Sequence, residues 1–181
     1  MIIALIGYRG SGKSSVARAL ATKLGWSWLD GDVVLEEHAG KSIREIFAQQ
    51  GEQAFRDLES EILTQLISGK NVVVALGGGV VLRPENRRRL QKPIVIWLQA
   101  TPEALHARIA TDPASNERRP NLTSAGGLAE IRKLLGERMP LYHECADYIV
   151  DTKEKSPEQI AAEIVSLVSD VIAQDVGGEN A

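Results

Sequence analysis

The residues best suited to chemistry lie close together near the start of the chain, where positions 7–14 read GYRGSGKS. This spacing, G-x-x-x-x-G-K-[S/T], is that of a phosphate-binding loop. Glycines allow positive φ, so that successive N–H groups can point toward an anion. The Lys13 ammonium suits the β- and γ-phosphates of a nucleotide, and the Ser14 hydroxyl suits Mg²⁺. The nucleotide-binding residues expected here are Gly10, Ser11, Gly12, Lys13, Ser14 and Ser15.

The segments on either side of this stretch fit the prediction. A phosphate-binding loop should follow a strand and begin a helix. Apolar Ile2–Ile6 suits a buried strand, and apolar residues recur at helical spacing from Val16 to Leu24. The alternative, an ordinary glycine-rich turn before a helix, is weaker once this context is considered.

Two carboxylates follow the second predicted strand, at Asp30 and Asp32. In an extended segment, residues two apart point to the same side. Beside a bound nucleotide, Asp30 would organise Mg²⁺ directly or through water, and Asp32 would orient a substrate hydroxyl or accept its proton. The alternative is a turn and helix cap at the end of a strand.

Three arginines are candidates for binding an anionic substrate such as a carboxylate: Arg56, Arg119 and Arg138. Each has a simpler interpretation. Arg56 would belong to a solvated charge ladder with Glu52 and Glu59, Arg119 would be a surface charge, and Arg138 would cap the end of a helix. No single arginine decides between these hypotheses.

A run of three glycines, Gly77, Gly78 and Gly79, directly follows the apolar run Asn71–Leu76. Without side chains, these residues would let a substrate touch the backbone. The alternative is a flexible turn.

Apolar runs alternate with helical patterns along the chain, which predicts a three-layer α/β/α fold with a five-stranded parallel sheet. Ligands in such folds bind at the carboxyl ends of the strands, so the glycine-rich loop, the two aspartates and the triple glycine should meet at one edge. We expect strands at about 2–6, 26–29, 71–76, 93–98 and 148–150, and helices at about 12–24, 33–38, 42–51, 52–68, 84–90, 102–109, 128–138 and 157–172, with Pro140 bending or restarting the seventh helix.

The chain has 181 residues, which suits a single domain over residues 1–173. Polar residues 111–127 are expected to form a mobile lid, and residues 174–181 a flexible tail. A net charge of −3 argues against nucleic acid as a partner, and no apolar run is long enough to span a membrane. The single Cys145 fits a reducing cytoplasm. We expect a cytoplasmic monomer.

Taken together and in order, these motifs resemble the shikimate kinase family. The matching segments are 7–14, 30–32, 35–36, 42–47, 51–56 with Glu59, 77–81, 119–120, 138–142 with Ala146, and 151–152. The resemblance implies a P-loop kinase fold with acceptor-binding helices at about 32–68, and transfer of phosphate from ATP, with Mg²⁺, to the 3-hydroxyl of shikimate.

The same resemblance implies a role for each site residue. The catalytic residues would be Lys13, Asp32 and Arg119, with Ser14 and Asp30 serving the metal ion. Outside the glycine-rich loop, the nucleotide would be bound by Arg108, Arg119, Thr152 and Pro157. Shikimate would be bound by Asp32, Phe47, Phe55, Arg56, Gly77, Gly78, Gly79 and Arg138.

Some positions depart from the family pattern. Ala17 stands where glycine is common, and Leu76 where a small polar residue is common. The lid is longer than in compact members, and Arg118 offers a second lid arginine beside Arg119. Gluconate kinase is the alternative within kinases, although it does not account for the triple glycine or for residues 138–142. A nucleotide-binding module without catalysis is the alternative from another class.

Overall fold

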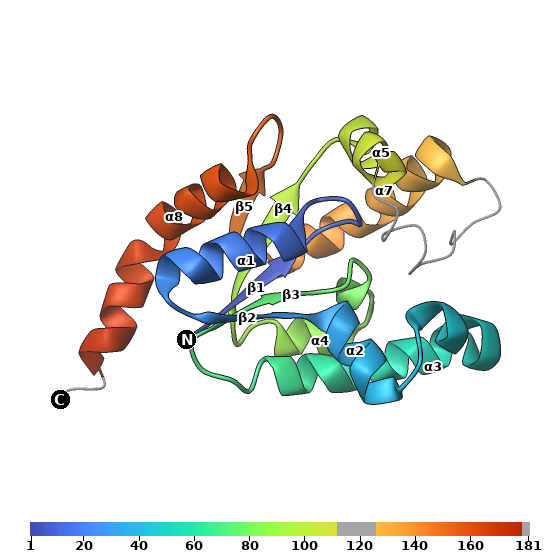
Figure 1. Ribbon diagram of the computed structural model, residues 1–181, viewed down its shortest axis with the longest axis horizontal. Helices are drawn as coiled ribbons and strands as arrows, with labels where there is room; N and C mark the ends of the chain where they lie inside the picture. The colour runs from blue at the N-terminus through green and yellow to red at the C-terminus, as the bar shows by residue number, and fades with distance from the viewer. Residues whose placement is uncertain (112–125, 179–181) are drawn as a thin grey trace.

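A parallel five-stranded sheet forms the middle layer of the protein, as the alternation of strands and helices predicts. The computed structural model describes residues 1–111 and 126–178. The strands are β1 (Ile2–Ile6), β2 (Ser27–Asp30), β3 (Val72–Ala75), β4 (Ile94–Gln99) and β5 (Tyr148–Asp151). Their order is β2-β3-β1-β4-β5, and each neighbouring pair is parallel. The loop that follows β1 therefore lies at the middle of the carboxyl edge (Figure 1).

Helices cover both faces of this sheet, because the central strand is apolar on both sides. Residues Ile2, Ala4 and Ile6 of β1 belong to one core cluster, and Ile3 and Leu5 to the other. Helices α1 and α8 pack on the second cluster, whereas α3 and α7 pack on the first (Figure 1). The helices are α1 (Lys13–Leu24), α2 (Gly31–Ala39), α3 (Ile43–Leu66), α4 (Pro84–Arg89), α5 (Pro102–Thr111), α7 (Gly127–Cys145) and α8 (Pro157–Gly178), with a short 3₁₀ turn, η1 (Val80–Leu82).

Helix α3 consists of two helical segments joined at a glycine. Gly51 has φ 82° and ψ 176°, which breaks the helix where the sequence analysis separates two helices. The first segment begins with a capping box, because the Ser42 hydroxyl accepts from the backbone N–H of Glu45 and the Glu45 carboxylate accepts from the N–H of Ser42. The second segment begins at Glu52, which places that residue one helical turn before Arg56.

Helix α7 extends beyond its expected end at residue 138 and continues through Pro140 to Cys145. Proline removes one helical hydrogen bond. Here, burial of Leu135 before the proline and of Tyr142 after it holds both parts of the helix on the same core. Tertiary packing therefore outweighs the local preference of proline. The final helix also continues past Ile172, to Gly178.

Three further expectations concern a membrane span, the lid and Cys145. Among the described residues, no helix is both long and apolar enough to cross a membrane. The predicted lid lies almost wholly outside the described residues. Cys145 is half-buried, and this burial raises the pKa of its thiol to about 11, so the thiol stays protonated at neutral pH.

Candidate active site

The loop after β1 has the backbone that its glycines predict. Gly7, Gly10 and Gly12 have φ values of 140°, 81° and 90°. A side chain at Gly7 would collide with the carbonyl oxygen of Leu98, 2.6 Å away, so the loop rests directly on the end of β4. Gly12 is the N-cap of α1, which directs the positive end of the helix dipole into the loop.

Lys13 folds back over this loop. Its Nζ donates to the carbonyl oxygens of Gly7 and Tyr8, at 2.9 Å each, and to Ser11 Oγ at 3.4 Å. The ammonium is therefore held at the mouth of the loop, where bound phosphates would need its charge. Ser15 lies exposed on the first turn of α1.

Asp30 joins the loop to the end of β2. Its Oδ2 accepts from the Ser14 hydroxyl at 2.5 Å, and its Oδ1 accepts from the backbone N–H of Asp32 at 3.0 Å, capping α2. The cap that the sequence analysis names as the alternative is thus present together with the contact to Ser14. A hydroxyl and a carboxylate are hard oxygen ligands of the kind Mg²⁺ takes, so these residues fit that ion.

The triple glycine separates the phosphate loop from the arginines. A side chain at Gly78 would lie 3.1 Å from the carbonyl oxygen of Gly7. One at Gly79 would lie only 2.8 Å from Cζ and Nη2 of Arg56. The absence of side chains therefore lets the loop and Arg56 approach the same stretch of backbone from opposite directions.

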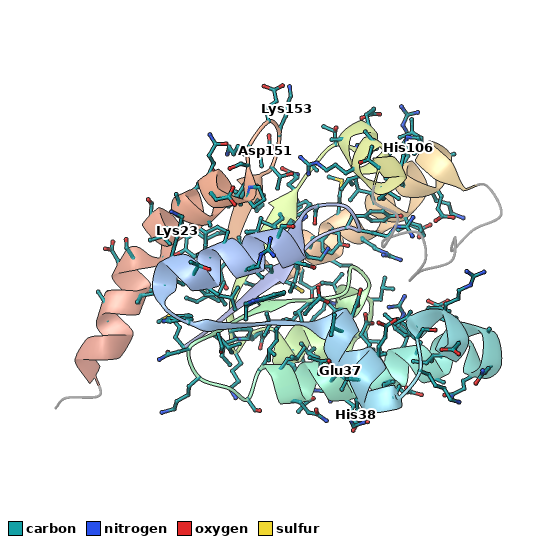
Figure 2. The ribbon with its side chains drawn as sticks, viewed as in Figure 1. Lys23, Glu37, His38, His106, Asp151 and Lys153 are labelled. Carbon is teal, nitrogen blue, oxygen red and sulfur yellow. The ribbon has the colours of Figure 1, made fainter. Side chains whose placement is uncertain are left out.

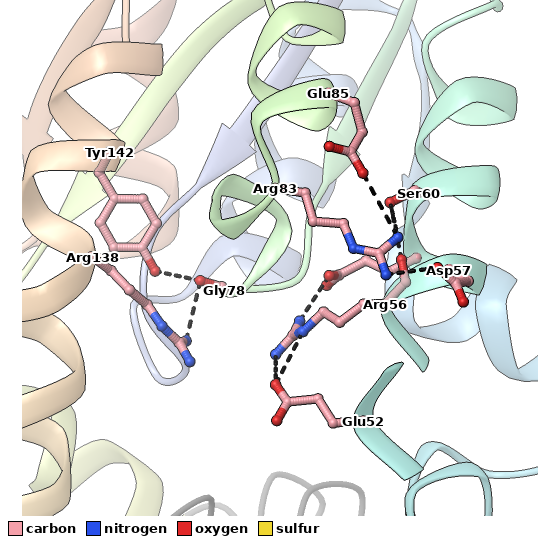
Figure 3. Close-up of polar contacts among 10 residues, drawn as sticks. Glu52, Arg56, Asp57, Ser60, Gly78, Arg83, Glu85, Arg138 and Tyr142 are labelled. Carbon is pink, nitrogen blue, oxygen red and sulfur yellow. Dashed lines mark hydrogen bonds and ion pairs between the residues drawn. The ribbon is translucent and has the colours of Figure 1, made fainter. Parts of the chain in front are cut away.

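Arg138 reaches this backbone from α7 (Figure 3). Its Nη1 donates to the carbonyl oxygen of Gly78 at 3.3 Å, and the Tyr142 hydroxyl donates to the same oxygen at 2.6 Å. The guanidinium also lies over the ring of Tyr8, 5.7 Å from its centroid. Arg138 is only 5% exposed, and no acidic side chain in residues 1–111 or 126–178 pairs with it. It is not at a helix end, so the capping interpretation is wrong.

Arg56 reaches toward the same place from α3 (Figure 3). It is 6% exposed, so the charge ladder proposed from the sequence forms but is not solvated at Arg56. Its Nη1 donates to Glu59 Oε2 at 2.7 Å, and its Nε and Nη2 donate to Glu52 Oε1 at 3.3 and 3.2 Å. The guanidinium lies 5.0 Å from the centroid of the Phe55 ring. Phe47 packs on Phe55 in turn, with ring centroids 4.7 Å apart.

Of the arginines in residues 1–111 and 126–178, only Arg56 and Arg138 are buried. Most charged side chains point outward, as Figure 2 shows for Lys23, Glu37 and Lys153. Burying a charge is costly unless an opposite charge or hydrogen bonds compensate it. Among residues 1–111 and 126–178, Arg138 has only the Gly78 carbonyl and an aromatic face as partners, so an anion bound beside it would supply the missing compensation.

Asp32 lies on the same side of the site as Arg56. It shares a small cavity of about 10 Å³ with Glu59 and Gly77, which is room for about one water molecule. Glu59 in turn holds Arg56. The carboxyl edge of the sheet thus gathers Asp32, Arg56 and Arg138 around the triple glycine, next to the phosphate loop. That arrangement suits transfer of a phosphoryl group to an anionic acceptor.

Arg108 and Thr152 meet near the end of β4, beside Gln99. The Arg108 guanidinium donates to Thr152 Oγ1 and to its carbonyl oxygen, at 2.9 Å each. Thr152 is fully buried and donates to the carbonyl oxygen of Gln99 at 3.0 Å. Pro157 begins α8 after the loop that follows Thr152.

Arg119, the expected lid arginine, lies outside the described residues. Two residues of the site, Tyr142 and Tyr8, can be recognised only from the structure. Tyr142 belongs to a segment that the sequence analysis names but assigns no role. Arg138 and Tyr142 are four residues apart and share one face only because the helix continues through Pro140. Tyr8 likewise contributes its ring beneath Arg138.

Comparison with known proteins is consistent with this geometry. The family model described as shikimate kinase matches residues 9–169. A shikimate kinase of Trichormus variabilis is 41% identical over 170 residues, covering 94% of this chain and 92% of the relative. This chain belongs to the shikimate kinase family.

Solved structures of the shikimate kinase family share its fold. The shikimate kinase from Acinetobacter baumannii in complex with shikimate superposes with a TM-score of 0.88 at 35% identity, covering 93% of each chain. The sheet and helices described above are thus the P-loop kinase fold expected from the sequence. A gluconokinase from Sinorhizobium meliloti has a TM-score of 0.59 at 16% identity, a likeness of fold alone.

Proposed function

We propose that this protein is a shikimate kinase, which transfers the γ-phosphate of ATP to the 3-hydroxyl of shikimate to give 3-phosphoshikimate and ADP, a step of aromatic amino-acid biosynthesis. The observation that carries the proposal is the pair of buried arginines, Arg56 and Arg138, on either side of the triple glycine. They provide a site for a carboxylate directly beside a phosphate-binding loop. Family membership supports the same acceptor.

On this proposal, the loop amides and Lys13 hold the β- and γ-phosphates. Ser14 and Asp30 bind Mg²⁺, which neutralises phosphate charge when it is present. Asp32 contacts the acceptor hydroxyl and orients it or takes its proton. Phosphoryl transfer depends mainly on such positioning and charge stabilisation.

The acceptor lies between α3 and α7. Arg56 and Arg138 grip its carboxylate, with backbone from Gly77 to Gly79 alongside. Phe47 and Phe55 form an apolar wall, which suits a carbon ring. Charged hydrogen bonds of this kind contribute about 1.5–3 kcal/mol each.

The remaining assignments complete the proposal. Arg119 closes over the phosphates from the lid at 111–127, and Arg108 with the Thr152–Pro157 segment borders the adenine. We place the reaction on one domain, residues 1–173, acting as a monomer. The single Cys145 is consistent with the cytoplasm.

Release of ADP with three acceptors tests the proposal: shikimate, gluconate and AMP. We expect turnover with shikimate alone. Turnover with gluconate alone would favour a gluconate kinase, and ATP binding without any phosphorylated acceptor would favour a non-catalytic module. Lys13→Met should lower kcat/KM at least about 10²- to 10³-fold, as loss of one charge-stabilising donor does in other enzymes. Lys23→Met, which changes an exposed lysine of the same helix, is the matched control.

A further inference from the structure

The two acidic partners of Arg56 differ in how firmly they are held. The Glu59 side chain is 7% exposed, and its oxygen lies 2.7 Å from Nη1. The Glu52 side chain is 60% exposed, and one of its two oxygens, Oε1, lies 3.2 Å from Nη2 and 3.3 Å from Nε. Glu59 is thus a fixed partner, whereas the exposed Glu52 side chain can rotate away from Arg56 toward solvent.

Glu52 occupies the side of the guanidinium that a carboxylate would use. An arginine binds a carboxylate best through two parallel N–H donors, and the Nε and Nη2 donors form one such edge. Both donors point to Glu52 Oε1. Because Nη1 is committed to buried Glu59, the edge facing Glu52 is the one whose partner can leave.

The break in α3 places Glu52 there. Gly51 interrupts the helix, so Glu52 begins the second segment and lies one turn before Arg56. A carboxylate in the first turn of a helix is also favoured by the helix dipole. Figure 3 shows Glu52 meeting the end of the Arg56 side chain that points toward Gly78 and Arg138.

We propose that Glu52 is an internal competitor of the substrate carboxylate: it holds Arg56 in the ligand-free protein and leaves when the acceptor binds. The inference rests on the proposed function, since it assumes a carboxylate acceptor at Arg56. Glu52 then sets the KM for the acceptor. It makes Arg56 available only to a ligand that brings its own negative charge.

The sign of the effect distinguishes this role from a structural one. If Glu52 merely holds Arg56 in place, its removal should raise the KM for shikimate. If it competes, removal should lower that KM. Ion pairs with one exposed partner contribute little, so we expect about a two- to fivefold decrease in KM.

The experiment measures KM and Kd for shikimate in Glu52→Gln and Glu52→Ala. Both values should fall in both variants, while the KM for ATP stays at the wild-type value. Glu61→Gln is the matched charge control, because Glu61 is an acidic residue on the same helix, is 57% exposed and pairs with His38 instead of Arg56. It should leave the KM for shikimate unchanged. Thermal unfolding of each variant checks that α3 is intact.

A neutral acceptor shows whether the gain in affinity depends on the negative charge of the ligand. With the carboxamide of shikimate, the Glu52 variants should bind no more tightly than the wild type. An equal gain with the carboxamide would overturn the proposal, as would an unchanged or higher KM for shikimate. Wild-type protein that neither binds nor phosphorylates shikimate would overturn the proposed function and this inference together. Wild-type turnover without tighter binding in the variants would overturn the inference alone.

Discussion

The phosphate loop and the acceptor pocket are neighbours built in opposite ways. The loop is one continuous stretch whose backbone N–H groups would bind the ligand, with glycines at positive φ and a lysine held by loop carbonyls. The pocket is made of side chains from α3 and α7, which meet across the triple glycine. Local sequence is therefore enough to form the first site, whereas the second exists only when distant helices pack correctly.

The two arginines of the pocket also differ from each other. Arg56 lies between two carboxylates, whereas Arg138 has a carbonyl oxygen and an aromatic ring. Arg56 is therefore part of what holds α3 together, and the charge of Arg138 is the one that a bound anion would compensate most. Perturbing each residue in turn tests that distinction.

Within the acceptor pocket, the largest expected effect comes from replacing the arginines. Arg56→Met and Arg138→Met should each raise the KM for shikimate about 10- to 150-fold, which corresponds to the loss of a charged hydrogen bond of about 1.5–3 kcal/mol. Their stabilities should differ. Arg56→Met removes the cation beside buried Glu59, which should cost about 3–5 kcal/mol of the free energy of unfolding, whereas Arg138→Met should cost less.

Steady-state kinetics and urea unfolding measure both quantities. Arg132→Met, which changes an exposed arginine of α7 paired with Glu103, is the matched control and should change stability by less than about 0.5 kcal/mol. Equal losses of stability in the two pocket variants would contradict the distinction between Arg56 and Arg138.

The triple glycine offers a smaller perturbation that separates pocket from loop. Gly79 has φ −101°, which alanine can adopt, so Gly79→Ala acts only by pressing on the Arg56 guanidinium. Overpacking of this kind costs about 1–3 kcal/mol, and we expect a KM for shikimate at least fivefold higher with an unchanged KM for ATP. Gly78→Ala presses on the loop carbonyl at Gly7 instead, so it should raise both KM values.

A third alanine variant is the control for backbone effects. Gly136 lies on α7, and apart from its own helix no atom of the described residues lies within 4 Å of the position of an added side chain, so Gly136→Ala should leave stability unchanged or slightly higher. If Gly79→Ala raised the KM for ATP as much as that for shikimate, the pocket and the loop would not be separable in this way.

The smallest effect is expected at the start of α3, away from both sites. Ser42→Ala removes a capping side chain and should cost about 0.5–2 kcal/mol of the free energy of unfolding. The Ser42 hydrogen bonds lower the pKa of Glu45. A lowered pKa means that the ionised carboxylate stabilises the folded state above its ordinary pKa and loses this effect as pH falls through the lowered value. The difference in Tm between wild type and Ser42→Ala should therefore narrow in acid, and a constant difference from pH 7 to pH 3 would contradict the link.

Most of the fold could be predicted from the sequence, because strands and helices follow from patterns a few residues long. The five strands lie within one or two residues of their expected positions, and the helix start at about residue 42 and the break at Gly51 are where the residues predict them. Pro140 is the exception. It does not end the helix, because packing on both sides of it holds the two parts on one core.

The sequence by itself determined the phosphate loop, since spacing and glycine content specify its backbone. It also named Arg56 and Arg138 as candidates for binding an anion, but it left open the alternatives of a solvated charge ladder at Arg56 and a helix cap at Arg138. Only the tertiary structure decided that both are buried and directed at Gly78 and Gly79, and that Glu52 and Tyr142 take part. The physical reason is that burial and charge compensation depend on which helices pack together, and residues 56 and 138 are brought together by the sheet and not by local sequence.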